Sequence, residues 1–185
     1  MTPQQQRILS FFGNEFDLFV LPDLRVLSEI RPDRKGLRAC TIPQAMLVFS
    51  IFDLLGYLIN PDVKASKQRT LKNYRALFTS PLALFPPEYQ KETDRIVQLF
   101  RHGLIHQFFP KASSIAKVSN PRPLIFPDGK ISCLNVDKLS TDTIAAIDRL
   151  RTLIAKESHR ALASQMSQRL DSMNKEDYDK LNELS

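Results

Sequence analysis

Cysteine and glycine are scarce in this chain of 185 residues, and each shortage limits what the chain can be. The two cysteines, Cys40 and Cys133, lie far apart and outside any CxxC pattern, so the sequence suggests neither a disulfide framework nor a thiolate zinc site. We therefore expect a reducing compartment, the cytoplasm. The five glycines leave long helix-compatible segments, and the twelve prolines fall mainly at apparent joints between these segments.

Several sequence signals are also missing. The N-terminal stretch MTPQQQRILSFFGNEF lacks the basic start, apolar run and cleavage site of a secretory signal, so we expect it to remain on the mature protein. The apolar stretch 45–59 is too short for a membrane span and contains Asp53, which favours a buried helix and no membrane association. No P-loop, no GxGxxG after a strand and no GxSxG elbow occurs, which narrows the choice of enzyme classes.

Length and composition predict a single domain over residues 1–185. An apolar content of 43% is enough for one substantial core, and nothing in the length demands a second. The 26 basic and 20 acidic residues give a net charge of +6. This modest excess permits an anionic partner such as RNA without requiring one.

The pattern of apolar residues and prolines predicts an all-α fold, an antiparallel bundle of four to five long helices with a small β-hairpin insertion near residues 113–136. The hairpin is indicated by β-branched residues around a PDG turn. Pro22 is expected to kink or end the first helix, and Thr41 to cap the second. The expected helices cover residues 3–29, 41–60, 66–79, 87–109 and 140–173, followed by a short tail helix over 174–184.

The stretch QLFRHGLIHQFFP, residues 98–110, concentrates polar chemistry late in the fourth expected helix. Helical spacing places one apolar face against the core, made of Ile96, Leu99, Phe100, Gly103 and Leu104. Arg101, His102 and Ile105 point away from that face, and His106 lies at its edge. A second copy of the chain is one way to cover the outward Ile105, and a dimer would bring Arg101 and His106 near their symmetry mates.

The hexapeptide from Arg101 to His106 resembles the R-x4-H motif of the HEPN (higher eukaryotes and prokaryotes nucleotide-binding) domains. The resemblance implies a helical core between about residues 1 and 170, with the hairpin as an insertion. It further implies a metal-independent endoribonuclease without cofactors, related to toxin or defence systems, whose site is composed of two copies across a homodimer. Such a protein can have an antitoxin or a nucleotidyltransferase as partner.

The same resemblance suggests roles for individual side chains. His106 would act as general base or acid, because an imidazole titrates near neutral pH. Arg101 would hold the scissile phosphate with its planar fork of donors, and His102 would assist. Asp53 needs a partner in its apolar helix, and either orients His106, pairs with Arg101 or lies at the surface without a function.

Basic residues in the stretch 64–75 are candidates for RNA binding, with Tyr74 available for base stacking, although most such runs are the solvated face of a helix. These residues are Lys64, Lys67, Arg69, Lys72 and Arg75.

Two other interpretations of the histidines remain open. His102 and His106 are four residues apart, which also suits two metal ligands on one helix face, but the glutamate of HExxH and a third ligand are missing, so we expect no metal. Alternatively, Arg101 and the histidines have a purely structural role. In that case the chain is a non-catalytic helical module of the same fold that binds RNA, a nucleotide or a protein.

Overall fold

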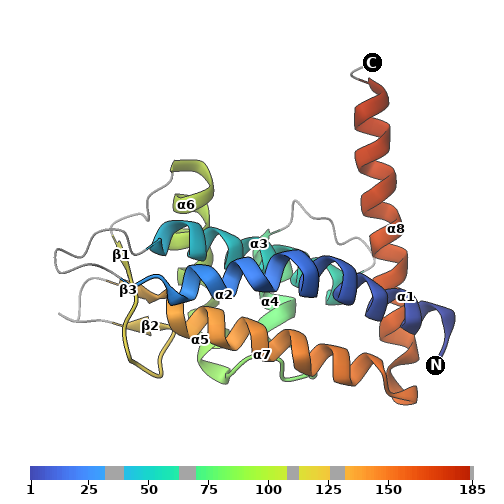
Figure 1. The fold of residues 1–185 in the computed structure, drawn as a ribbon, viewed down its shortest axis with the longest axis horizontal. Helices are drawn as coiled ribbons and strands as arrows, with labels where there is room; N and C mark the ends of the chain where they lie inside the picture. Colours follow the sequence, from blue (N-terminus) through green and yellow to red (C-terminus); the bar gives the residue numbers. More distant parts are fainter. Residues whose placement is uncertain (32–39, 63–69, 108–112, 126–131, 184–185) are drawn as a thin grey trace.

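The computed structural model describes residues 1–31, 40–62, 70–107, 113–125 and 132–183, and the chain is mostly helical, as predicted (Figure 1). Four of the five expected long helices are present in the described residues, and two of them contain π-helical segments. The N-terminal one consists of α1 (Pro3–Phe11), the π-helical segment η1 (Phe12–Val20) and α2 (Leu21–Glu29), which follow one another without a break. We call these three segments together the rod.

The rod buries Ile8, Phe12, Phe16, Leu21 and Leu24. Three of the four steps between these residues fit an ordinary helix, but Phe16 and Leu21 are five residues apart, and the wide π turn brings both to the core face. Pro22 was expected to kink or end the helix. Instead it lies in the first turn of α2, directly after the π-helical segment, and the helix continues to Glu29.

Helix α3 (Thr41–Ile59) is the central element of the core, and nearly all of its second half is buried. Thr41 was expected to be its N-cap. The cap is Cys40 in a left-handed conformation, and Thr41 is the first helical residue. By length and apolarity α3 would be able to cross a membrane, but 61% of the apolar stretch is buried inside the fold, as in a core helix.

Helix α4 (Thr70–Phe78) packs on α3, and Phe52 of α3 lies at the centre of the aromatic core between them. Five aromatic rings surround that of Phe52 edge to face, at centroid distances of 5.2–6.4 Å: Phe49, Tyr74, Phe78, Phe85 and Tyr89.

The next long helix consists of α5 (Pro87–Arg95), the π-helical segment η2 (Ile96–Arg101) and α6 (His102–Gln107).

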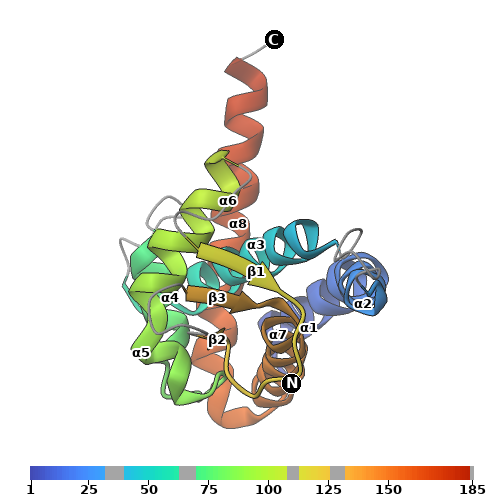
Figure 2. The same cartoon turned by 90° about the vertical axis from the view of Figure 1, so that its left-hand side faces the viewer.

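The expected hairpin corresponds to a three-stranded sheet with the order β1-β3-β2, seen at the end of the molecule in Figure 2. The strands are β1 (Ser113–Ala116), β2 (Leu124–Ile125) and β3 (Ser132–Asn135). Strands β2 and β3 pair antiparallel across the PDG stretch, which itself lies outside the described residues, whereas β1 pairs parallel to β3. A repeat of apolar and polar residues does not specify which strands pair, so the parallel strand was not predicted.

The C-terminal helices differ from the prediction. A single helix over 140–173 was expected, but α7 (Val136–Ile154) ends early and a short 3-10 turn, η3 (Glu157–His159), separates it from α8 (Arg160–Glu183). The separate tail helix predicted over 174–184 was also wrong, because that segment continues α8. The C-terminal half of α8 projects beyond the rest of the molecule (Figure 1, Figure 2).

Candidate functional site

Arg101 is the last residue of η2, and its helix is fixed to the core by the face that the spacing predicted. Ile96, Phe100 and Leu104 are fully buried, and Leu99 is partly buried against the core. The π-helical turn additionally brings Val97 into the core. Arg101 therefore lies at the edge of a rigid apolar contact rather than on a free helix.

The side chain of Arg101 is held by Asp53 of α3. Its Nε and Nη2 atoms both donate hydrogen bonds to Asp53 Oδ2, at 3.1 and 2.9 Å. Only 15% of the Arg101 side chain and 24% of the Asp53 side chain are exposed. Of the roles considered for Asp53, the structure thus realises the pairing with Arg101. An ion pair this shielded is screened less by water and salt than one at the surface.

The second carboxylate oxygen, Asp53 Oδ1, is buried and has no hydrogen-bond partner among the described residues. Burial raises the pKa of Asp53 above its ordinary value, and the charge and hydrogen bonds of Arg101 oppose this shift. Arg101 therefore offsets only part of the unfavourable free energy of burying the charged carboxylate.

Tyr74 of α4 lies beside this ion pair and is fully buried. Its hydroxyl donates a hydrogen bond to the backbone oxygen of Phe49 at 3.0 Å. Burial raises the pKa of Tyr74 well above its ordinary value, the charge of Asp53 adds to the shift, and Arg101 opposes it. The expectation that Tyr74 is available for base stacking was wrong, because the ring belongs to the aromatic core.

The two histidines of the motif lie on α6. His102 is its first residue, is partly buried and has a contact within the chain. The backbone of His106 belongs to the same helix, but its side chain and that of Ile105 lie outside the described part of the structure. Within the described residues no group of three or more His, Cys, Asp or Glu side chains is arranged to hold a metal ion. Cys40 and Cys133 are both free thiols.

The predicted RNA-binding residues are only partly described. Lys72 and Arg75 are exposed on α4, whereas Lys64, Lys67 and Arg69 lie outside the described residues. The guanidinium of Arg75 forms two bonds of 3.0 Å with Asp94 of α5, which neutralises its charge at the surface. Of these two residues, Lys72 is thus the one without an acidic neighbour in the described structure.

Sequence reasoning missed Tyr74 as a neighbour of the candidate site. A signal was present, since Tyr74 shares a helical stripe with Leu71, Leu77 and Phe78 that predicts burial. The position of its hydroxyl next to Asp53 and Arg101 depends on how α4 packs on α3, which the sequence does not specify.

Fold and site together define the chain as a mostly helical protein with a shielded arginine–aspartate pair beside a histidine-bearing helix. No protein-family model, curated protein or solved structure matches the chain. The functional assignment therefore depends on the chemistry of the site itself.

The raised pKa of Asp53 predicts a pH dependence of stability with a defined sign. Between the ordinary pKa of 3.8 and the raised one, the folded chain keeps a proton that the unfolded chain releases, so the contribution of Asp53 to stability falls as pH rises. The asparagine of the Asp53→Asn variant does not ionise, so the stability of this variant lacks the pH-dependent contribution of Asp53. We expect the free energy of unfolding of the wild type, relative to that of Asp53→Asn, to decrease from pH 3.5 upward in urea titrations. A difference that stays constant or increases with pH would contradict the shift.

Proposed function

We propose that the protein is a metal-independent endoribonuclease of the HEPN type, an antiparallel helical bundle in which two copies form a composite site around Arg101 and His106. The observation that carries the proposal is the arginine held by Asp53 directly before a helix that carries His102 and His106. A guanidinium fixed by a carboxylate offers its remaining N–H groups in a defined orientation, as a phosphate-binding fork requires.

The reaction follows from these groups. The ribose 2′-hydroxyl loses its proton to the imidazole of His106 and attacks the adjacent phosphorus, while the bond to the 5′-oxygen of the next nucleotide breaks. The imidazole of the other copy returns a proton to the leaving 5′-oxygen. Arg101 stabilises the charge that builds on the phosphate oxygens, assisted by His102. The products are a 2′,3′-cyclic phosphate and a free 5′-hydroxyl.

Asp53 is a positioning residue in this proposal. It contacts Arg101 from α3 and keeps the guanidinium from turning back onto its own helix. Tyr74 is buried beside the pair and contributes to its shielding from water. Lys72 adds a cationic contact for the RNA backbone. We further propose that the protein is cytoplasmic and homodimeric, with an antitoxin or a nucleotidyltransferase as partner.

The test is cleavage of structured and single-stranded RNA by the purified chain in excess chelator. We expect fragments with cyclic phosphate and 5′-hydroxyl ends, at a rate unaffected by the chelator. Because the site needs two copies, the rate per subunit should fall when dilution dissociates the dimer. Cleavage that requires a divalent cation, or fragments with 5′-phosphate ends, would exclude the mechanism.

A second candidate function is a non-catalytic RNA-binding module, and the shielding of Arg101 favours it. An arginine with 15% of its side chain exposed and two donors bound to Asp53 also suits a purely structural ion pair between α3 and η2. RNA binding that weakens with salt, without any cleavage, would support this alternative over the enzyme.

A further inference from the structure

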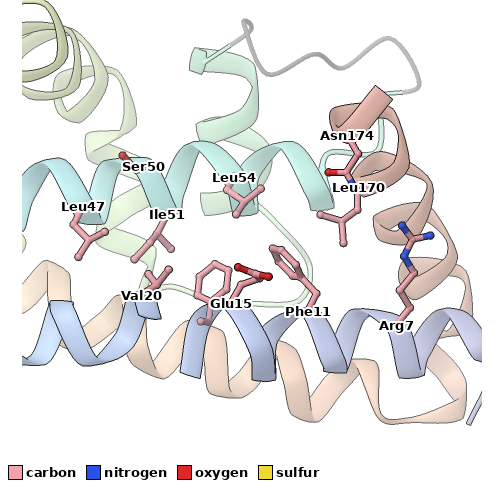
Figure 3. Close-up of a pocket in the computed structure, with 11 residues that line it drawn as sticks. Arg7, Phe11, Glu15, Val20, Leu47, Ser50, Ile51, Leu54, Leu170 and Asn174 are labelled. Atoms are coloured by element: carbon pink, nitrogen blue, oxygen red, sulfur yellow. The ribbon is translucent and has the colours of Figure 1, made fainter. Parts of the chain in front are cut away.

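A groove of about 560 Å³ lies between the rod and α3, and α8 bounds one of its ends (Figure 3). We call it the rod groove. Its walls are mostly apolar and come from three elements that are far apart in the sequence. Its apolar walls include Phe11 and Val20 of the rod, Leu47, Ile51 and Leu54 of α3, and Leu170 of α8.

Exposed apolar side chains also lie on the rod outside the groove. Phe19 follows Glu15 of the groove by four residues, about one helical turn, and 63% of it is exposed. Leu18 is 65% exposed and Val26 58% exposed. Three of the five large apolar residues that are exposed in the described part of the chain thus lie on the rod. Exposed apolar side chains that are concentrated on one element mark an interaction site more often than scattered ones do.

The rod groove carries one uncompensated charge, and it is negative. The carboxylate of Glu15 points into the groove between apolar side chains (Figure 3) and forms no hydrogen bond or ion pair with any described residue. The only basic side chain among the described residues that line the groove is Arg7, and it is already bonded to Asp171 of α8. A molecule with an apolar body and a cationic group opposite Glu15 therefore complements the groove.

We propose that the rod groove binds an amphipathic helix of a partner protein, with apolar side chains at positions i, i+3 or i+4, and i+7, and a lysine or arginine facing Glu15. A helix satisfies its own backbone hydrogen bonds, and its side chains fit between two neighbouring helices as ridges between grooves. The C-terminal segment of a second copy is poorly matched, because residues 171–185 carry five acidic and two basic side chains. This inference is independent of the ribonuclease proposal.

The experiment uses a fluorescein-labelled, stapled helical peptide of about four turns, with leucines along one face and one lysine on that face. Fluorescence polarisation measures its binding to the full chain. We expect exchange of the lysine for glutamate to weaken binding about fivefold, and Glu15→Lys to reverse this preference. Leu54→Asp should weaken binding about tenfold or more. Ser50→Arg should also do so, since it fills the groove at an exposed position without disturbing the core.

The matched control is Glu29→Lys, which makes the same charge change at an exposed position of α2 outside the groove and should leave the affinity unchanged. Thermal unfolding of each variant verifies that the fold is retained. Absence of peptide binding, or a preference that Glu15→Lys does not reverse, would overturn the proposal. So would sedimentation showing that the wild type self-associates through this face, with Ser50→Arg producing monomers, because the occupant would then be a second copy.

Discussion

Replacing His106 by alanine is expected to lower the rate of RNA cleavage by about 100- to 10,000-fold, the range for loss of a general acid or base. His106→Ala removes the group that takes the proton from the 2′-hydroxyl, whereas binding of the RNA backbone depends on cationic side chains and should change little. A single-turnover assay with excess enzyme measures the chemical step, and a filter-binding assay measures affinity. The pH–rate profile of the wild type should show a group that titrates near neutrality and is lost in the variant.

The matched control for this variant is His159→Ala. His159 lies in η3, between α7 and α8, and its Nδ1 contacts the hydroxyl of Ser158. The same chemical change at this third histidine should leave cleavage at the wild-type rate. If His106→Ala and wild type cleave RNA equally fast, the assignment of His106 is wrong and the activity comes from another group or another protein. A loss in both variants would indicate damage to the fold.

The part of the candidate site that the sequence could predict is the part that depends on local spacing. The positions of Ile96, Phe100 and Leu104 on one helical face are a property of the helix alone, and their burial was predicted correctly. The pairing of Asp53 with Arg101 was among the alternatives, because a carboxylate in an apolar helix needs a cation. Which cation it is depends on how the long helix that contains η2 and α6 is placed relative to α3, and this is a tertiary property.

The features that were not predicted have a weak local signal in the sequence or none. The segment 155–159 between α7 and α8 contains neither proline nor glycine, so nothing in its sequence interrupts a helical pattern. The π-helical turns of η1 and η2 are likewise not detected when apolar residues are searched for at the three- and four-residue spacing of an ordinary helix. The sequence reflects η1 only in the spacing of two buried residues, Phe16 and Leu21, which are five residues apart where an ordinary helix has three or four. In each case the packing of the segment against the rest of the fold determines its local geometry, and the helix propensity of its residues is compatible with more than one geometry.

Gly56→Ala is expected to lower the free energy of unfolding by about 2–3 kcal/mol, because the backbones of α3 and α4 approach each other closely at this glycine. A Cβ atom at position 56 would lie 2.6 Å from the backbone oxygen of Asn73, well inside the contact distance. Neither atom belongs to a flexible side chain, so one helix must move. For a chain of this length the loss corresponds to a melting temperature lower by about 5–10 °C.

The movement of α4 would not remain local. The side chain of Asn60 donates to that of Asn73 at 2.9 Å, and Tyr74, the next residue, shields the ion pair of Asp53 with Arg101. Displacing α4 therefore weakens a buried hydrogen bond as well as the packing around the candidate site. Gly13→Ala is the matched control, since a Cβ atom there meets nothing within 4 Å. In the rod, alanine should stabilise the fold by up to about 1 kcal/mol. Equal melting temperatures for the two variants would show that α3 and α4 have room to separate, and that Gly56 does not determine their distance.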